Sequence, residues 1–353
     1  MTDLDSREFL MRNDPDGMLG HMLSFAEHLR AADAAALAAL EPVELETPDA
    51  VVVAGMGGSA IAGDILRGAL SDVMATPMSV VRGYGLPGFV TERTLVIASS
   101  YSGNTEETLA AHDDAASRGA RVVCVTTGGE LGRKAAAAGE PVVPLEPGLP
   151  PRAALGFGLV SVLRILAAAG LADDASGAVE SMAEVAEKAA QRFGPEALSD
   201  SNAAKGLAIW FGAGVPVIYG VEPATAAVAT RWAGQLAENA KTVGHANVLP
   251  EMNHNELVGF GDREALGGAA RVVFLRDEDD HDRIALRARI TADVLSEEGV
   301  ESREATSFGR TRLARLLSLV LLGDYSSVYL AALRGVDPTP VEPIERLKRA
   351  LSA

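Results

Sequence analysis

Residues 94–108 combine an apolar run with a cluster of hydroxyl groups and a glycine, TLVIASSYSGNTEET. The run at 95–98 predicts a buried strand, and Asn104 or Thr105 after the turn predicts a helix start. The first amides of a helix lack intrahelical partners and carry partial positive charge. This pattern predicts a site for a small phosphorylated metabolite, although an ordinary turn with a well-capped helix is the alternative. The candidate hydroxyls are Ser100, Ser102 and Thr105, with Ser99 as a neighbour.

A glycine-rich segment at residues 55–64, GMGGSAIAGD, follows an earlier apolar run. It matches the start of a dinucleotide fingerprint, but Ala60 takes the place of the third glycine and no acidic residue follows the next predicted strand. A nicotinamide site is therefore disfavoured. Gly57 and Gly58 would instead let the backbone approach a phosphate, and Ser59 adds a hydroxyl. No P-loop lysine follows residues 94–108, which argues against a nucleotide.

The histidines and the single cysteine form no recognisable metal motif. His254 and Glu256 lie two positions apart, and His245 lies nine positions earlier, which is not an HExxH-like spacing. Cys124 lies in an apolar run and is predicted to be a small core residue rather than a disulfide or thiolate metal ligand. The sequence therefore predicts no metal and no cofactor. The remaining histidines lie in charged helical contexts and are expected to be solvated: His21, His28, His112 and His281.

Composition limits the class of partner. The chain has 353 residues, 48% of them hydrophobic, and a net charge of −17. This charge argues against nucleic acid or an anionic membrane surface as a partner, so a phosphate must be bound locally by amides, hydroxyls and a few cations. No stretch stays apolar for the roughly 18 residues that a membrane span needs. The charged N-terminus lacks the apolar core of a signal peptide, and we expect a cytoplasmic protein.

Alternating apolar runs and amphipathic stretches predict an α/β fold of two doubly wound, flavodoxin-like lobes with parallel sheets. Because ligands bind at the carboxyl ends of parallel strands, we expect the site there, between the lobes. A segment rich in alanine and acidic residues, 170–200, predicts a solvated helical connector. The predicted divisions are an N-terminal helical segment at 1–48, a first lobe at 49–155, a connector at 156–205, a second lobe at 206–308 and C-terminal helices at 309–353.

Residues 55–64 and 99–108 together resemble the sugar isomerase (SIS) domain. Later motifs narrow the resemblance to the bifunctional phosphoglucose/phosphomannose isomerase family: PPRAA at 150–154, QLAENAK at 235–241, PEMNHNE at 250–256 and GDYSSVYL at 323–330. The similarity covers about residues 45–350. It implies two SIS subdomains, a homodimer, no metal requirement and interconversion of the 6-phosphates of fructose, glucose and mannose.

The resemblance also implies roles for individual side chains. Glu238 matches the proton-transfer base, and Arg152 matches the arginine that stabilises the enediolate. His254 matches the ring-opening residue, which the family supplies from the neighbouring subunit, and Lys348 matches the C-terminal active-site lysine. Aldose–ketose isomerisation needs such groups, because a proton moves between C2 and C1 through a cis-enediol after the ring opens. The matching phosphate-binding hydroxyls are Ser59, Ser100, Ser102 and Thr105.

These side chains also have structural alternatives. Glu238 precedes Lys241 by three residues and could form a surface pair with it. His254 could be a loop or capping residue, and Arg152 could bind a backbone carbonyl.

Two features leave the interpretation open. Lys348 lies in the segment ERLKR, where Arg346 and Arg349 compete for the same role. Glu222 follows the predicted strand 215–221, where the family continues with small residues, and its charge would oppose a nearby phosphate. The alternatives to the bifunctional isomerase are a non-catalytic sugar-phosphate-binding protein and an isomerase acting on another phosphosugar.

Overall fold

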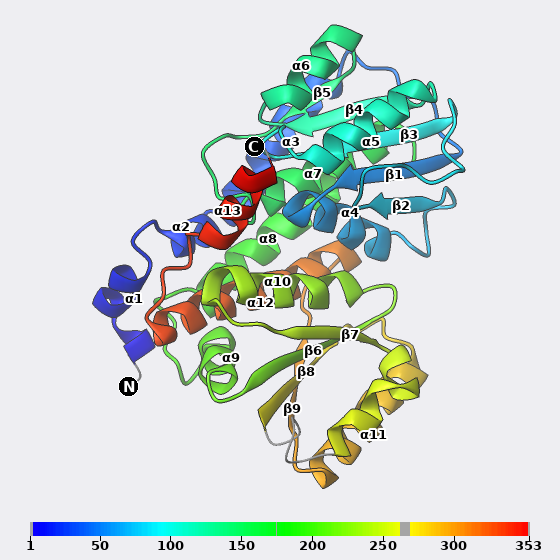
Figure 1. Cartoon of the computed structure of the whole chain (residues 1–353). Helices are drawn as coiled ribbons and strands as arrows, with labels where there is room; N and C mark the ends of the chain where they lie inside the picture. Colours follow the sequence, from blue (N-terminus) through cyan, green and yellow to red (C-terminus); the bar gives the residue numbers. More distant parts are fainter. Residues whose placement is uncertain (1–2, 174, 262–268, 352–353) are drawn as a thin grey trace.

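The computed structural model describes residues 3–173, 175–261 and 269–351. Figure 1 shows two parallel sheets with a layer of helices between them. The first sheet contains β1 (Ala50–Gly55), β2 (Met78–Val81), β3 (Thr94–Ser99), β4 (Arg121–Thr126) and β5 (Val142–Pro144). The second contains β6 (Val215–Val221), β7 (His245–Leu249), β8 (Ala270–Arg276) and β9 (Glu301–Thr306).

Helices make up most of the remaining described chain. Those of the N-terminal half are η1 (Asp3–Asp5), α1 (Arg7–Asn13), α2 (Met18–Leu23), α3 (Phe25–Leu40), α4 (Gly57–Ala69), α5 (Glu106–Ser117), α6 (Gly129–Ala138) and α7 (Leu155–Ala168). Those that follow are α8 (Ala175–Phe193), α9 (Ala203–Phe211), α10 (Ala226–Ala240), η2 (Glu251–His254), η3 (Glu256–Gly261), α11 (Asp282–Glu297), α12 (Arg312–Arg334) and α13 (Glu342–Leu351).

The two sheets share one strand order. The first runs β2-β1-β3-β4-β5 and the second β7-β6-β8-β9, with every neighbouring pair parallel. Counted from its own first strand, the second sheet repeats the order of the first four strands of the first sheet. This is the flavodoxin-like order, whose direction reverses between the first and third strands. The predicted α/β fold of two doubly wound lobes is confirmed.

The central core lies between the sheets. The central strands β1 and β3 are rich in valine and isoleucine because both of their faces are buried. In β1, Val51 and Val53 face the inner helices, while Val52 faces the outer layer. The inner layer is formed by α3, α4, α7, α8, α9, α10 and α12. Helices α5 and α6 cover the outer face of the first sheet, and α11 covers that of the second.

Helix α12 crosses the middle of this core. Its length and composition would suit a membrane span, but 94% of its most apolar 18-residue window is buried inside the fold. It packs against α8, α9 and α10. The Thr311 hydroxyl caps its start and Gly335, with a positive φ of 63°, ends it. It is the core helix on which the second lobe and the connector both pack.

The prediction of a solvated connector at 170–200 is wrong for α8. Its residues Val179, Met182, Val185 and Phe193 are buried in the central core, and α8 packs against α3 and α12. Together with Ala175, Ala183, Ala186 and Ala189, these side chains recur every three or four positions and form one buried face. The high alanine content of this face and the glutamates beside it hide the pattern when the segment is judged by its composition.

The expectation of solvated histidines also fails in part. His112 is 4% exposed, and its Nε2 lies 2.7 Å from the Glu140 carboxylate. His21 and His28 are half-buried, whereas His281 is exposed as expected. His112 lies on the face of α5 that covers the sheet. The charged residues next to it in sequence lie on the other faces of the helix, and for this reason they gave the wrong prediction. Cys124 is fully buried, which confirms its predicted burial in the core, and its Sγ lies 3.8 Å from Glu140 Oε2.

Candidate active site

Two helix N-termini meet at the reversal point of the first sheet. Strands β1 and β3 are neighbours, with Gly55 opposite Ser99, and lead into α4 and α5. Neither helix has a side-chain capping bond at its N-cap, Met56 or Thr105, among the residues that the structure describes. Their first amides therefore remain available to an anion.

The predicted hydroxyls lie at this point. Ser100 is buried; its Oγ accepts from the Gly103 amide at 3.1 Å and lies 2.8 Å from Thr105 Oγ1. Ser102 is exposed and its Oγ accepts from the Asn104 amide. Ser99 Oγ is buried without a hydrogen-bond partner in the described chain. Hydroxyls fixed by such bonds, beside open helix amides, are groups that can hold an anion without a cation.

The predicted glycines bring α4 close to the turn that carries Arg152. Gly57 has a positive φ of 50° at the start of α4, and Ser59 is half-buried. A Cβ on Gly58 would lie 3.1 Å from the Pro151 carbonyl oxygen, so a larger residue would push this turn away.

Arg152 and Glu238, distant in sequence, meet beside this turn. The Arg152 side chain is 5% exposed, and its Nη1 lies 3.6 Å from Glu238 Oε2 on α10. Glu238 is 37% exposed and lines a cavity of about 420 Å³ between the end of α10 and the start of α13. Burial lowers the pKa of Arg152, an effect that the Glu238 carboxylate opposes. The structure thus joins a solvent-accessible carboxylate to a buried cation.

His254 does not reach these groups within one chain. It is exposed at the end of η2 and makes no hydrogen bond or ion pair with Glu238 or Arg152 among the described residues. Its segment is anchored by Glu256, which accepts from Tyr219 Oη at 2.5 Å and from Asn247, and lies 3.0 Å from His245 Nε2. Burial opposes ionisation of Glu256, but these hydrogen bonds prevail and its pKa is lowered.

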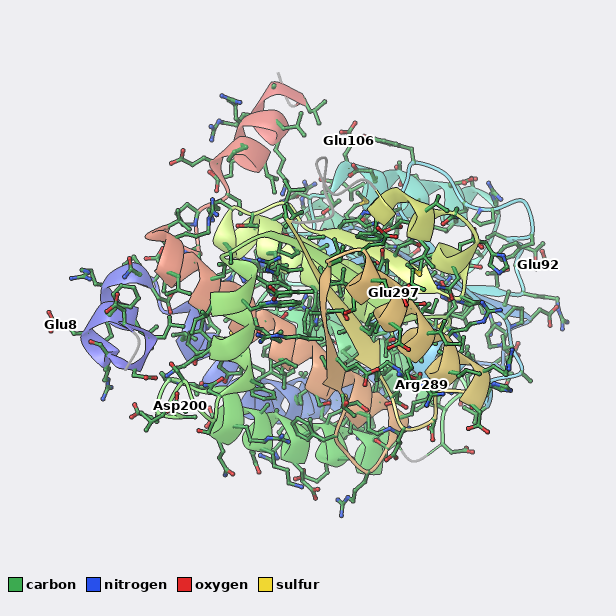
Figure 2. All side chains as sticks on the ribbon, turned by 90° about the horizontal axis from the view of Figure 1, so that it is seen from below. Glu8, Glu92, Glu106, Asp200, Arg289 and Glu297 are labelled. Carbon is green, nitrogen blue, oxygen red and sulfur yellow. The ribbon has the colours of Figure 1, made fainter. Side chains whose placement is uncertain are left out.

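Lys348 lies on α13, whose residues are all exposed. Figure 2 shows α13 projecting from the rest of the molecule. Arg346 and Arg349 lie on the same exposed helix, and Arg349 forms an ion pair with Glu345 at 3.9 Å. A single chain therefore does not enclose Lys348 in the site formed by Arg152 and Glu238.

Comparison with known proteins shows the family of the chain. A model of the SIS domain matches residues 44–140, and a model of the bacterial phospho-glucose isomerase C-terminal SIS domain matches residues 200–351. The bifunctional phosphoglucose/phosphomannose isomerase of Caldicellulosiruptor bescii is 43% identical over 312 residues, which cover 88% of this chain and 91% of the relative. The chain belongs to the bifunctional phosphoglucose/phosphomannose isomerase family.

Further relatives support the family and the fold. The bifunctional phosphoglucose/phosphomannose isomerase of Aquifex aeolicus is 39% identical and covers 85% of this chain and 90% of its own. A crystal structure of a hypothetical protein from Thermus thermophilus superposes with a TM-score of 0.74 at 18% identity, covering 98% of this chain and 93% of that one. The last comparison shows the fold alone.

The family motifs contain polar residues whose contacts their sequence does not reveal. Asn239 Oδ1 accepts from Arg152 Nε at 2.6 Å, and its Nδ2 donates to Ser327 Oγ at 2.9 Å. The carbonyls of Pro338 and Thr339 accept from Arg152 Nη2. The motifs ENAK and GDYSS thus meet at the guanidinium of this isomerase-family protein.

A second buried arginine fixes the backbone of the same turn. Arg231 Nη2 donates to the Arg152 carbonyl at 3.0 Å. The Arg231 guanidinium also binds both carboxylate oxygens of Asp324, at 3.0 and 2.6 Å. Such a buried pair, with its hydrogen bonds satisfied, specifies one arrangement of α10, α12 and the turn. Sequence reasoning missed it, and the available signal was a charge in the middle of each of two largely apolar helices.

The alternative of a surface pair between Glu238 and Lys241 is not observed. Lys241 Nζ donates to the Glu238 backbone carbonyl at 2.5 Å and to the carbonyls of Pro338 and Pro340. Burial lowers the pKa of Lys241, and nearby Arg152 adds to this effect. Lys241 therefore holds the segment before α13 against the end of α10, and leaves the Glu238 carboxylate facing Arg152.

Glu222 is exposed and lines a separate cavity of about 460 Å³ with Asp64, Arg67 and Arg82. None of the hydroxyls at the reversal point of the first sheet lines that cavity. Glu222 therefore shares its cavity with two arginines, which both pair with Asp64, and not with the candidate phosphate-binding hydroxyls.

Proposed function

We propose that this chain interconverts fructose 6-phosphate with glucose 6-phosphate and mannose 6-phosphate through a cis-enediol, without a metal requirement, in the cytoplasm. Family membership supports the reaction class. The observation that carries the proposal is the contact between Arg152 and Glu238 beside an anion site at two helix N-termini. In this proposal the helix N-termini would bind the phosphate, Glu238 would act as the base and Arg152 would provide the positive charge that the reaction needs.

In the proposed step, the Glu238 carboxylate removes the proton from C1 of the open-chain ketose. The C1–H electrons form the C1=C2 bond while the carbonyl oxygen at C2 gains negative charge, which Arg152 stabilises. The hydroxyl proton on the C1 oxygen passes to the oxygen on C2, which becomes a hydroxyl. Glu238 then returns its proton to C2, and the electrons left on the C1 oxygen form the aldehyde C=O bond. Return to opposite faces of C2 gives the glucose or the mannose configuration. No external oxidant or reductant is consumed.

The phosphate would bind between the starts of α4 and α5, on Gly57, Gly58, Ser59, Ser100, Ser102 and Thr105. This assignment is supported by the open amides and by the fixed hydroxyls of Ser100 and Thr105.

His254 would open the sugar ring from the second subunit of a homodimer. Its exposure within one chain supports an action in trans. Lys348, on the exposed α13, would complete the site. Both assignments therefore depend on assembly of two chains.

The test is turnover of fructose 6-phosphate in EDTA, with glucose 6-phosphate and mannose 6-phosphate measured separately. Formation of both products is expected.

Glu238→Gln removes the base while keeping its size, and kcat is expected to fall by about 10²- to 10⁴-fold with substrate binding retained. Glu342→Gln is the matched control, because this residue lines the same cavity as Glu238. An active Glu238→Gln enzyme would overturn the assignment of the base. Thermal stabilisation by fructose 6-phosphate without either product would identify a binding protein instead.

A further inference from the structure

Three potential metal ligands converge on the outer side of the first sheet, away from the isomerase site. His112 lies on α5, Cys124 on β4, and Glu140 in the connection between α6 and β5. His112 Nε2 lies 2.7 Å and Cys124 Sγ 3.8 Å from Glu140 Oε2, and the three donor atoms lie within 4.8 Å of one another. The Glu140 side chain is 15% exposed, and the other two are buried.

The donor set is one that zinc binds. Imidazole nitrogen, thiolate sulfur and carboxylate oxygen are its usual protein ligands, and three of them leave a fourth position for water. Bonds of about 2.0–2.3 Å place tetrahedral ligands roughly 3.5 Å apart, so each donor atom needs to move by about 1 Å at most. The three ligands come from separate elements, which is why their sequence spacing reveals no motif.

Two neighbouring features fit a metal-bound imidazole. Asp113 Oδ1 lies 3.4 Å from His112 Nδ1, where it can accept that N–H and fix the tautomer with Nε2 free for the metal. Asp113 is itself held by Lys134 Nζ at 2.6 Å. A carboxylate behind the imidazole is the usual support of a zinc-binding histidine.

The balance of charge also favours a cation. Among the described residues, Glu140 forms an ion pair with His112 and with no lysine or arginine. A simple His–Glu pair would leave Cys124 as a packing residue, replaceable by any small side chain. A zinc ion with one thiolate, one carboxylate and a neutral imidazole has no net charge, which suits a largely buried position.

We propose that His112, Cys124 and Glu140 form a zinc site that ties α5 to β4 and to the start of β5. On binding, zinc displaces the proton of the thiol, which passes to solvent, while His112 and Glu140 bind through Nε2 and a carboxylate oxygen. The ion supports the helix whose N-terminus lies at the phosphate site. It takes no part in proton transfer at Glu238.

The test uses the full chain, stripped of metal with EDTA and freed of the chelator. Zinc is titrated in competition with a chromophoric chelator, and cobalt(II) is added separately. We expect one zinc ion per chain, a raised Tm and a cobalt spectrum with a near-ultraviolet sulfur-to-metal charge-transfer band. Absence of tight zinc binding, or a cobalt complex without that band, would overturn the proposal.

Variants assign the ligands. Cys124→Ala and Glu140→Gln are expected to weaken zinc binding by on the order of 100-fold or more, whereas His281→Asn, which removes an exposed histidine, should leave it unchanged. Equal zinc affinity in Cys124→Ala and the unmodified chain would refute the site. Circular dichroism of the metal-free variants checks folding, and the cobalt spectrum needs no variant. Because neither readout uses turnover, failure of the isomerase assay would leave this result intact.

Discussion

The Arg152 guanidinium donates to three neutral oxygen atoms and lies near the carboxylate of Glu238. Asn239 Oδ1 and the carbonyls of Pro338 and Thr339 satisfy its Nε and Nη2 groups. These acceptors fix the side chain without cancelling its positive charge, which remains available to a developing enediolate. The 3.6 Å separation from Glu238 is longer than a strong hydrogen bond, so the proposed base is oriented but not held by the arginine.

Asn239→Leu tests this positioning. The substitution leaves the buried Arg152 Nε without its acceptor, which should cost about 1–3 kcal/mol of stability. Because the guanidinium can then shift, we expect kcat to fall by on the order of 10²-fold with a much smaller change in KM. Ser327→Ala is the control, since it removes the oxygen to which Asn239 donates and a hydrogen bond to the Asp324 carbonyl, but keeps the Asn239 oxygen that accepts from Arg152. An unchanged kcat in a folded Asn239→Leu enzyme would show that Arg152 needs no such support.

The lowered pKa of Glu256 makes the stability of the fold depend on pH through the segment that carries His254. Its folded pKa lies below the ordinary value of 4.5, so its stabilising effect is present above that value. The effect is lost as pH falls through the folded pKa. We therefore expect Glu256→Gln to reduce the free energy of unfolding at pH 7, and this deficit to narrow as pH falls below about 4.5. Urea unfolding at several pH values measures it, with Glu251→Gln as control; a deficit independent of pH would contradict the linkage.

At the scale of elements, the strands could be predicted closely and the helices less well. Runs such as AVVVAG and TLVIAS are apolar on both faces and end at glycine or serine, which marks a buried parallel strand. The prediction for α8 failed because much of its buried face is alanine, which composition alone does not mark as buried. The proximity of the motifs around Glu238 and Arg152 came from the family resemblance. The contacts of Asn239 and Arg231 could not be predicted, because only folding decides which buried polar groups meet.

The start of α5 provides a test of the phosphate site. Thr105→Val keeps the shape of the side chain but removes the hydroxyl that bonds Ser100. A hydrogen bond to a charged group contributes about 1.5–3 kcal/mol, so KM is expected to rise roughly 10- to 100-fold with kcat nearly unchanged. Ser117→Ala, at the other end of α5, is the control. Equal KM values for Thr105→Val and the unmodified enzyme would remove Thr105 from the phosphate site.

For the whole molecule, the repeated strand order raises the question of why one lobe alone would bind phosphate. After β8, at the position that corresponds to Ser100, the second lobe has Asp277, buried and bound to Arg315 and Ser307. The hydrogen bonds outweigh burial and lower the pKa of Asp277, so the position carries a negative charge. That negative charge opposes the binding of a phosphate at this position.

The boundaries between the lobes, placed at 49–155 and 206–308 from the sequence, stay predictions. One continuous cluster of inner helices packs against both sheets, so the core does not divide between them. The sequence shows two successive alternations of strands and helices, which predict two lobes. It carries no sign that the two lobes share one central layer of helices.

The last prediction concerns the assembly of two chains. If His254 acts across a dimer, each site takes Glu238 from one chain and His254 from the other. Glu238→Gln and His254→Asn would each be inactive alone.

A mixed dimer would contain one site with both substitutions and one intact site. With equal co-expression and random pairing, half of the dimers are mixed, so activity should recover to about a quarter of the wild-type value. If both residues act within one chain, every site in every dimer carries a substitution and no activity returns. Turnover of the co-expressed mixture, compared with each variant alone, therefore decides whether His254 acts in trans.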